Sequence, residues 1–515
     1  MILEQAAEAA EPAAGDAPGV LSWPLSAKNR RALRAQASRL ADRVRTGPGT
    51  DPADLGLSLA TGRTAFRERA VVVGRDTAEL LAGVRAIAQG TSSASVAEGS
   101  ADDGRTAFVF AGQGTQRVGM GAGLRAAHPV FAAAWDEICA CLDPHLRRPV
   151  AEIIDDPDAL RRTEFTQPAL FAFKVALFRL LESWGLTPDL VLGHSVGEVA
   201  AAHVAGVLGL ADACALVAAR ARLMQARPDD GLMIAVEATE EEMAPLLSAR
   251  VSLAAVNGPR SVVIAGDAEA VEAVALRFAG RRTKRLDVSH AFHSAHMDGM
   301  LDAFHDAAAR LTFHPPRLAL VTNLTGRTAT ACDAGHWTRQ VRQPVRFADG
   351  IRTALAEGVT RFLDIGPDGT TAAMIEDCLD REAVVVAAQR PDRPEPEALA
   401  LAVARAHTAG AEVDWPALYG GPRPRVALPT YAFQRERYWP DTEDALPTGR
   451  TGHPWLTGAT ELADGGWVFT GRLTLAGQPW LADHTVLDTA VVPGTALLDL
   501  VLAAAAEPAP PESAN

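Results

Sequence analysis

Cysteine, long apolar runs and positive charge are all scarce in this sequence, and each absence excludes a class of protein. The five cysteines form no Cys-x-x-Cys pair, so we expect reduced thiols, with neither a disulfide framework nor a metal site. No run approaches the ~18 apolar residues that a membrane helix needs. Met1 to Asp16 lack the basic start and apolar stretch of a signal peptide. We therefore expect a cytoplasmic protein with no membrane partner.

The charge balance is acidic, with 49 Lys and Arg against 63 Asp and Glu and a formal net charge of -14. Nucleic-acid binders show a basic patch or stripe, so we expect no nucleic-acid partner. The 515 residues are enough for about three domains at ~150 residues each.

Shifts in composition and periodicity divide the chain into segments. A small α/β unit comes first, a polar, serine-rich break over 90–104 follows as a linker, and a large α/β unit takes up the centre. The expected segments are 1–20 (a leader), 21–98 (the small unit), 105–390 (the large unit), 391–445 (a linker whose aromatic residues favour packing), 453–506 (a partial domain) and 507–515 (a disordered tail).

The large unit carries two kinds of pattern. A strand over 107–110 leads into a glycine-rich turn, and a strand over 190–192 leads through a sharp turn into a helix over 198–207, which indicates α/β architecture. Residues 231–288 instead follow the order strand, helix, strand, strand, helix, strand, which is the ferredoxin-like pattern. We therefore predict a ferredoxin-like subdomain inserted into the large one, with function in the cleft between them.

The segment Gly193-His194-Ser195-Val196-Gly197 fits the Gly-x-Ser-x-Gly pattern of a nucleophile elbow. Small residues flank the serine because bulky neighbours would clash in so sharp a turn. The positive end of the following helix favours developing negative charge. The pentapeptide alone also fits an ordinary turn, but the strand before it and the helix after it favour a serine nucleophile.

A serine nucleophile needs a base, and a histidine-containing cluster at 289–294 follows the last strand of the inserted subdomain. That place is the mouth of the expected cleft, so His290 or His293 could reach Ser195 from the opposite wall. His194 adjoins the serine, but neighbours across a sharp turn point apart. Either cleft histidine could instead be structural. Because no acidic third member stands out, a Ser-His dyad and a triad both stay open.

Two further features could serve acyl transfer. The backbone N–H of Val196 and one from the glycine-rich turn around Gln113 could form an oxyanion hole. That turn lacks the Lys-Ser/Thr of a phosphate-binding loop, which argues against nucleotide binding. Arg220, on a helix downstream of the elbow, could grip a substrate carboxylate or could lie on a solvated helix face.

Four motifs together resemble the acyltransferase domain of modular type I polyketide synthases, within the wider group of malonyl-CoA:acyl carrier protein transacylases. They occur in family order and spacing over roughly residues 105–390: Phe110-Ala-Gly-Gln-Gly-Thr-Gln116, Gly193-His-Ser-Val-Gly-Glu198, Arg220 and His290-Ala-Phe-His293. The resemblance implies an α/β-hydrolase-like large subdomain and no permanently bound cofactor. It implies malonyl-CoA as substrate, and as partners an acyl carrier protein, whose phosphopantetheine thiol receives the acyl group, and a neighbouring ketosynthase.

The resemblance also assigns roles to the candidate residues. Ser195 would be the nucleophile, His293 its base, Arg220 the anchor for the extender's free carboxylate, and Gln113 and Val196 the oxyanion donors.

A further contact is implied for the base. A backbone carbonyl near residues 340–345 would steady the histidine. Gln340 stands where many relatives have histidine, a change that a main-chain contact should tolerate.

A malonyl extender unit is suggested in the same way. His290-Ala-Phe-His293 looks like the malonyl-type signature, where methylmalonyl-type relatives tend to carry Tyr-Ala-Ser-His, and Phe292 would crowd an α-methyl branch. Val196 and the segment ending at Gln167 point the same way, so His290, Phe292 and Gln167 are expected at the substrate. One methyl group is worth only ~1–3 kcal/mol of discrimination, so selectivity need not be absolute.

The flanks resemble other parts of such a synthase. Met1-Ile-Leu-Glu-Gln5 looks like the end of a ketosynthase, residues 20–98 like the linker domain between ketosynthase and acyltransferase, and residues 428–439 like the linker that follows the acyltransferase.

Residues 453–506 look like the start of a dehydratase double-hotdog domain. His484 and Pro493 match its histidine motif, but Asp488 stands where the motif has glycine, and no second hotdog follows. We therefore expect no dehydration by this chain and a partly unfolded segment.

Two other functions stay open. The same elbow would serve a serine hydrolase or thioesterase, which would need neither Arg220 nor the inserted subdomain. The other is a non-catalytic docking fragment of a larger synthase, against which the complete set of site residues argues.

Overall fold

A computed structural model describes residues 18–47, 49–288, 290–435 and 451–506. The chain forms two compact units, one through Phe433 and one from Gln434. Most of the expected leader, the expected tail at 507–515 and part of the expected linker lie outside the described residues.

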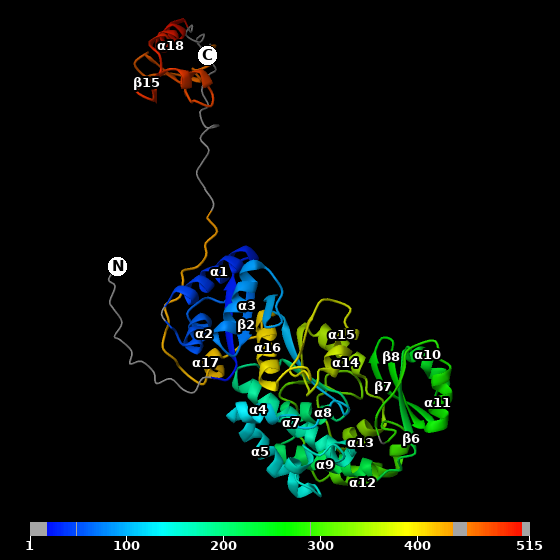
Figure 1. The fold of residues 1–515 in the computed structure, drawn as a ribbon. Coiled ribbons are helices and arrows are strands. Elements are labelled where there is room, and N and C mark those ends of the chain that lie inside the picture. Colours follow the sequence, from blue (N-terminus) through cyan, green and yellow to red (C-terminus); the bar gives the residue numbers. More distant parts are fainter. Residues whose placement is uncertain (1–17, 48, 289, 436–450, 507–515) are drawn as a thin grey trace. The chain divides into compact units, whose positions relative to one another are not determined.

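The first unit opens with a small α/β layer, drawn in blue in Figure 1. Its three strands pair antiparallel in the order β1-β2-β3. Fully buried Trp23 anchors β1 by donating its indole N–H to the carbonyl of Pro52 at 2.7 Å. The elements of this layer are β1 (Leu21–Ala27), α1 (Arg30–Thr46), α2 (Pro52–Thr61), β2 (Glu68–Gly74), α3 (Thr77–Gln89) and β3 (Val96–Ser100).

The serine-rich break over 90–104 is not only a linker, and that prediction is wrong. Residues 96–100 form β3, which pairs with β2 from Val72↔Val96 to Glu68↔Ser100. The strand lies at the sheet edge, and Ala97 is its one buried residue, so its sequence lacks a strand-like apolar pattern.

A five-stranded parallel sheet forms the centre of the large subdomain, in the order β10-β5-β4-β11-β12. Its strands are β4 (Arg105–Phe110), β5 (Leu190–Gly193), β10 (Ala319–Val321), β11 (Val359–Ile365) and β12 (Val384–Ala387). Phe110 of β4 pairs with Gly193 of β5, so the glycine-rich turn and the serine elbow leave the sheet side by side at its carboxyl edge.

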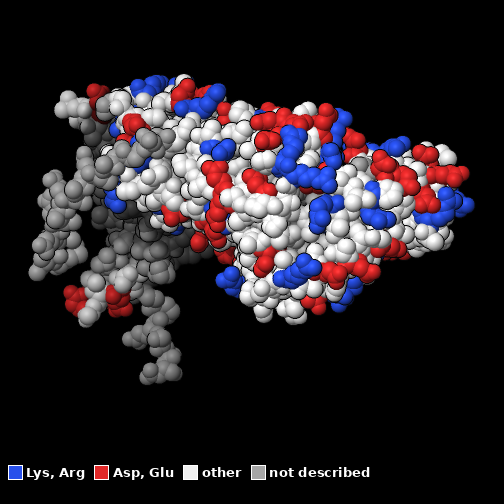
Figure 2. Space-filling view, turned by 90° about the horizontal axis from the view of Figure 1, so that it is seen from below, with Lys and Arg blue, Asp and Glu red and all other residues white. Residues whose placement is uncertain are grey.

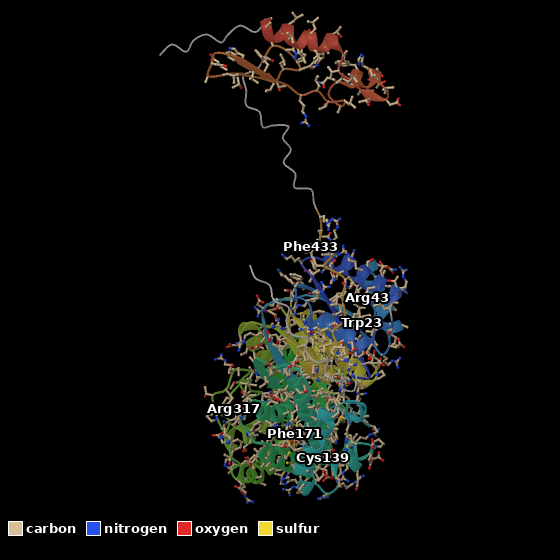
Figure 3. The ribbon with its side chains drawn as sticks, turned by 90° about the vertical axis from the view of Figure 1, so that its left-hand side faces the viewer. Trp23, Arg43, Cys139, Phe171, Arg317 and Phe433 are labelled. Atoms are coloured by element: carbon tan, nitrogen blue, oxygen red, sulfur yellow. The ribbon has the colours of Figure 1, made fainter. Side chains whose placement is uncertain are left out.

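Helices pack around this sheet. Helical periodicity predicts a helix over 167–184, and the longest helix, α7, begins earlier, at Thr163. It is buried from Thr163 to Phe178 because apolar side chains lie on every face of this stretch; Phe171 is labelled in Figure 3. The helices are α4 (Ala122–Ala127), α5 (Pro129–Leu142), α6 (Val150–Ile153), α7 (Thr163–Ser183), α8 (Gly197–Val204), α9 (Leu210–Gln225), α12 (Leu301–Ala308), α13 (Ala334–Arg342), α14 (Phe347–Ala356) and α15 (Thr370–Asp377), with short 3-10 turns at Asp143–His145, Ala159–Arg161 and Ala295–Met300.

The inserted segment forms a separate four-stranded antiparallel sheet, in green in Figure 1, with the order β7-β8-β6-β9. Numbered within the insert, that order is 2-3-1-4, which fits the predicted ferredoxin-like pattern. The sequence pattern predicts the last strand over 283–288, and the observed strand ends earlier, at Arg285. The elements are β6 (Gly231–Val236), α10 (Glu240–Met243), a 3-10 turn (Ala244–Leu246), β7 (Val251–Gly258), β8 (Ser261–Asp267), α11 (Ala268–Leu276) and β9 (Thr283–Arg285).

The chain then returns to the small α/β layer. Helix α16 (Glu395–Thr408) packs between that layer and the large subdomain, and α17 (Trp415–Leu418) follows it. Beyond α17 the Tyr431 hydroxyl accepts from the backbone of Lys28 at 3.1 Å. The segment 421–432 therefore packs onto the small layer as far as Ala432, whose backbone N–H donates to Gln36 Oε1 at 3.0 Å, whereas Phe433, labelled in Figure 3, is 70% exposed.

The second unit holds two hairpins and one helix. They are β13 (Gly458–Glu461), β14 (Trp467–Thr470), a 3-10 turn (Pro479–Asp483), β15 (Thr485–Val486), β16 (Thr489–Ala490) and α18 (Gly494–Ala506). The sequence over 466–475 is rich in strand-forming residues, but only Trp467–Thr470 of it forms a strand, β14. Among the described residues of this unit the buried apolar side chains are few, and Leu497, Leu498, Val501 and Leu502 of α18 are exposed.

Several global properties are plain in the structure. All five cysteines are unpaired. Over the residues described, no helix has the length and apolarity to cross a bilayer, and no three His, Cys, Asp or Glu side chains gather as metal ligands. On the face shown in Figure 2, acidic and basic side chains are interspersed.

Candidate active site

The elbow is a sharp turn that only glycine permits on either side of the serine. An added Cβ on Gly193 would lie 2.1 Å from the carbonyl carbon of Gly197, and one on Gly197 would lie 2.0 Å from the carbonyl oxygen of Phe110. Both obstacles are backbone atoms, which cannot rotate away. Ser195 itself has a φ of 50°.

Positive φ also marks the partner of the serine. Among the described non-glycine residues of the first unit, Ser195 and His293 (φ 56°) alone have this left-handed conformation. Such backbone costs about 1–3 kcal/mol and concentrates at functional sites.

The two strained residues meet. Ser195 Oγ lies 2.8 Å from Nε2 of His293, whose Nδ1 lies 2.9 Å from the carbonyl oxygen of Gln343. Because a carbonyl only accepts, Nδ1 carries the proton and Nε2 is free to accept from the serine hydroxyl. The contact falls within the 340–345 segment that the family resemblance indicated. In the described part of the chain no carboxylate pairs with His293, so the arrangement is a dyad supported by a carbonyl.

The environment keeps His293 neutral. Burial and the nearby charge of Arg220 lower the pKa of His293 to about 3, although the hydrogen bond to Gln343 opposes the shift. A neutral imidazole beside a serine hydroxyl can take its proton.

Arg220 is the cation of the site. It is only 1% exposed, and its guanidinium donates to Ser195 Oγ at 3.0 Å and to Gln167 Oε1 at 2.7 Å. Burial lowers the pKa of Arg220 to about 9, against an opposing effect of Glu198, so the side chain remains charged at neutral pH. Its Nε is buried without a partner, and no ion pair involving Arg220 is found among the described residues. The alternative of a solvated helix face is therefore excluded.

The glycine-rich turn reaches the same place. Gln113 Oε1 accepts from Gln167 Nε2 at 3.2 Å, which links the turn to the Arg220 side chain. In the described structure neither the backbone N–H of Gln113 nor the backbone N–H of Val196 has a hydrogen-bond acceptor. Two free backbone donors thus flank the serine.

These residues line a cavity of about 790 Å³ between the two subdomains. Gln113, Gln167, Ser195 and Arg220 lie on the large-subdomain wall. The opposite wall comes from the insert, which matches the expected cleft. Phe292 and His293 also line the cavity.

Two histidines do not take part. His290, expected at the substrate, does not line the cavity; it is buried and its Nε2 bonds the carbonyl oxygen of Arg227 at 3.0 Å. His194 lines the cavity but bonds Asn257 at 2.8 Å, and so turns away from the serine hydroxyl as predicted.

Sequence patterns missed several buried supports. Lys174 donates to the carbonyl of Ala111 at 2.6 Å and so fixes the glycine-rich turn. Asn323 and Gln340 contact the backbone of Ser195. The sequence offered a buried lysine inside an apolar helix and the unusual Gln340 as signs, but it did not predict that either amide contacts Ser195.

Comparison with known proteins identifies this arrangement. The family model of the acyl transferase domain matches residues 107–413. The chain belongs to the polyketide synthase acyltransferase family. It is an acyltransferase with an α/β-hydrolase-like large subdomain and a ferredoxin-like small one, as predicted. Two further family models match the flanks, a CurL-like polyketide synthase C-terminal region at 23–83 and a polyketide synthase dehydratase domain at 453–514.

Solved structures give the same family. The acyltransferase domain from the second module of the salinomycin polyketide synthase is 50% identical, with a TM-score of 0.68 over 80% of this chain and 99% of that one. A malonyl-CoA:acyl carrier protein transacylase from Xanthomonas oryzae is 30% identical, with a TM-score of 0.52 over 56% of this chain and 96% of that one.

Curated relatives are much longer. Polyketide synthase GfsA of Streptomyces halstedii is 50% identical over 98% of this chain, and mycoketide-CoA synthase of Mycobacterium tuberculosis is 50% identical over 96%. The chain spans only 7% and 12% of these two proteins.

Proposed function

We propose that Ser195 takes a malonyl group from coenzyme A and passes it to the phosphopantetheine thiol of an acyl carrier protein. The observation that carries this is the buried guanidinium of Arg220, which lies 3.0 Å from the serine Oγ and has no ion pair among the described residues. A buried cation without a counter-ion is costly unless a ligand supplies the negative charge. An acyl group with a free carboxylate close to its thioester supplies it.

The chemistry is ping-pong transfer. His293 Nε2 takes the proton of Ser195 as Oγ attacks the thioester carbonyl, and the tetrahedral oxyanion is bound by the amides of Gln113 and Val196. The C–S bond breaks, the thiolate of coenzyme A leaves with the proton from His293, and malonyl-Ser195 remains. The carrier thiol then repeats the attack, giving its proton to His293, and Ser195 regains a proton as the new thioester forms.

Malonyl is favoured over a branched extender by Phe292. Its ring lies in the cavity lining, against the ring of His290 at 5.9 Å between centroids, and is only 7% exposed. His290 therefore supports the wall rather than contacting the acyl group. An α-methyl branch would have to displace the ring, a discrimination of ~1–3 kcal/mol. One solved relative, the SpnD acyltransferase domain (33% identical, TM-score 0.71), is described in complex with 2-(pent-4-yn-1-yl)malonyl, a branched malonyl group, which supports a dicarboxylic acyl group here but not the choice of the unbranched one.

Partners follow from the reaction. An acyl carrier protein must bring its thiol to the cavity, and the resemblance of the flanks supports a ketosynthase as the neighbouring domain. No bound cofactor has a part in these steps.

Intact-protein mass measured after mixing with malonyl-CoA, methylmalonyl-CoA or acetyl-CoA tests the proposal. We expect a malonyl adduct on the wild type and on Ser261→Ala, a second serine of the cavity wall, but not on Ser195→Ala. No adduct from any substrate, or equal labelling of Ser195→Ala, would refute the function. Faster labelling by methylmalonyl-CoA would refute only the extender choice.

A further inference from the structure

The backbone of Ser195 is held on both sides by side-chain amides from distant elements. Asn323 Oδ1 accepts from the Ser195 N–H at 2.7 Å, and its Nδ2 donates to the carbonyl of Gly193 at 2.5 Å. Gln340 Nε2 donates to the carbonyl of Ser195 at 2.8 Å. The strained residue is therefore bracketed by two planar, directional groups.

Asn323 and Gln340 both donate hydrogen bonds to one buried carboxylate, that of Glu198. Glu198 Oε2 accepts from the backbone N–H of Asn323 at 3.1 Å and from Gln340 Nε2 at 3.3 Å, and Oε1 lies 2.8 Å from Nε2 of His336. Glu198 has no exposed surface. Because a carboxylate only accepts, these contacts fix the positions of the donors around it.

Sheet topology explains how Asn323 reaches the elbow. It comes two residues after β10, which pairs with β5 so that Val321 lies opposite Leu192. Asn323 is thus level with the turn itself, at the carboxyl edge. None of Asn323, Gln340, Glu198 and His336 lines the cavity, so they act on the serine through its backbone.

We infer that Asn323, supported by Gln340 and Glu198, is a positioning residue that locks Ser195 in its left-handed conformation. In that conformation Oγ is within hydrogen-bond distance of both His293 and Arg220. A lone left-handed serine persists only when its surroundings hold it there. The inference rests on the proposed function, since the rate it governs is acylation of Ser195.

The two amides are not equivalent. The Ser195 carbonyl also accepts from the Glu198 N–H at 3.0 Å, so loss of Gln340 leaves one donor in place. Among the described residues, Asn323 Oδ1 is the acceptor found for the Ser195 N–H. Asn323 therefore carries the larger share of the lock.

Single-turnover acylation by malonyl-CoA tests the lock. We expect Asn323→Ala to lower the limiting rate by roughly 10- to 100-fold, the scale of a displaced reacting group, with unchanged half-saturation. Asn323→Asp keeps an acceptor for the Ser195 N–H but loses the donor to Gly193, so its rate should lie between. Gln340→Met should cost less than Asn323→Ala.

A matched control is Gln389→Ala. Gln389 is also buried and donates its amide to a backbone carbonyl, that of Glu395 at 3.2 Å, but it is not in the elbow network. It should lower the melting temperature and leave the rate per folded molecule unchanged. A rate for folded Asn323→Ala within twofold of wild type, or a change confined to half-saturation, would overturn the lock. If Asn323→Ala does not fold, Asn323→Asp decides by the same criteria.

A second probe separates this inference from the proposed function. Diisopropyl fluorophosphate needs only a reactive serine: Oγ bonds phosphorus, fluoride leaves, and the proton goes to His293. We expect the variants to rank in the same order by rate of fluorophosphate labelling as by rate of malonyl acylation. If wild type resists malonyl-CoA but the fluorophosphate order holds, the proposed function fails and the lock stands. If malonyl-CoA labels wild type but neither reagent gives the expected ranking of variant rates, only the positioning role of Asn323 is wrong.

Discussion

At the scale of single residues, the candidate site brings together three side chains from distant parts of the chain. Ser195 lies between His293 at 2.8 Å and Arg220 at 3.0 Å. Local sequence predicted the elbow around Ser195, because the shape of that turn is determined by neighbouring residues. It left the histidine undecided between His290 and His293, since which of them reaches the cleft depends on the turn at 290–294, where His293 takes a positive φ.

Removing the charge of Arg220 should change substrate preference more than fold. We expect Arg220→Met to slow malonyl transfer by roughly 10- to 150-fold, equivalent to ~1.5–3 kcal/mol for a charged hydrogen bond, while acetyl transfer falls much less. Initial acylation rates with malonyl-CoA and acetyl-CoA measure this. Arg222→Met, at an exposed position of the same helix, should leave both rates unchanged; an equal loss for both substrates in Arg220→Met would contradict the anchor.

The acylation rate should be insensitive to pH across the usual histidine range. Burial and Arg220 lower the pKa of His293 to about 3, so the base gains a proton only as pH falls through that value. We therefore expect no loss of single-turnover rate from protonation of His293 between about pH 8 and about pH 5. Near-UV circular dichroism at each pH controls for unfolding. Loss of half the rate near pH 6.5 in folded protein would indicate that the pKa of His293 is close to the ordinary histidine value, which would contradict the prediction.

At the scale of elements, the site exists because two sheet connections end at one edge. The turn after β4 and the elbow after β5 leave adjacent strands, and β10 adds Asn323 on the other side. Periodicity predicted the strands around 107–110 and 190–192 and the inserted subdomain. It missed β1, the edge strand β3 and the central strands β10, β11 and β12. It also could not predict that Asn323 bonds Ser195, because 128 residues separate them.

The glycines of the elbow make a prediction about stability. Gly197→Ala would set a Cβ 2.0 Å from the Phe110 carbonyl oxygen. The clash is with backbone, so we expect a loss of at least ~1–3 kcal/mol in the free energy of unfolding. Urea denaturation measures it.

A matched glycine provides the control. Gly209, at the start of α9, has ordinary backbone (φ -62°) and nothing within 4 Å of an added Cβ. Gly209→Ala should be nearly neutral, and equal losses for the two variants would contradict the account of the elbow.

At the scale of the whole molecule, the first unit holds every candidate site residue and the second unit holds none. The dehydratase-like unit has its own local order: Leu487 and Asp488 form a two-residue hairpin loop with φ values of 50° and 59°, between β15 and β16. Left-handed backbone explains why glycine suits the Asp488 position, and Asp tolerates it better than most residues do. The expectations of partial unfolding and of no dehydration stay predictions.

Truncation should separate the two units. A chain ending at Arg435 keeps the candidate site and residues 421–435, so it should be acylated at the full rate. A chain ending at Gly420 loses the Arg423–Asp54 ion pair (2.7 Å) and the Tyr431 contacts. Its small α/β layer should therefore melt several degrees lower, which corresponds to a loss of about 1–2 kcal/mol in the free energy of unfolding. Calorimetry and acylation rates check both. Full stability without 421–435 would contradict the packing role of that segment.

The most direct test of the central claim is a chase of the acyl-enzyme. Radiolabelled malonyl-Ser195, freed of coenzyme A, is mixed with an acyl carrier protein that carries phosphopantetheine. The account predicts that label moves to the carrier thiol as a thioester, faster than it appears as free malonate. Release of label only as malonate, at a rate independent of the carrier, would make the protein a hydrolase and contradict the account.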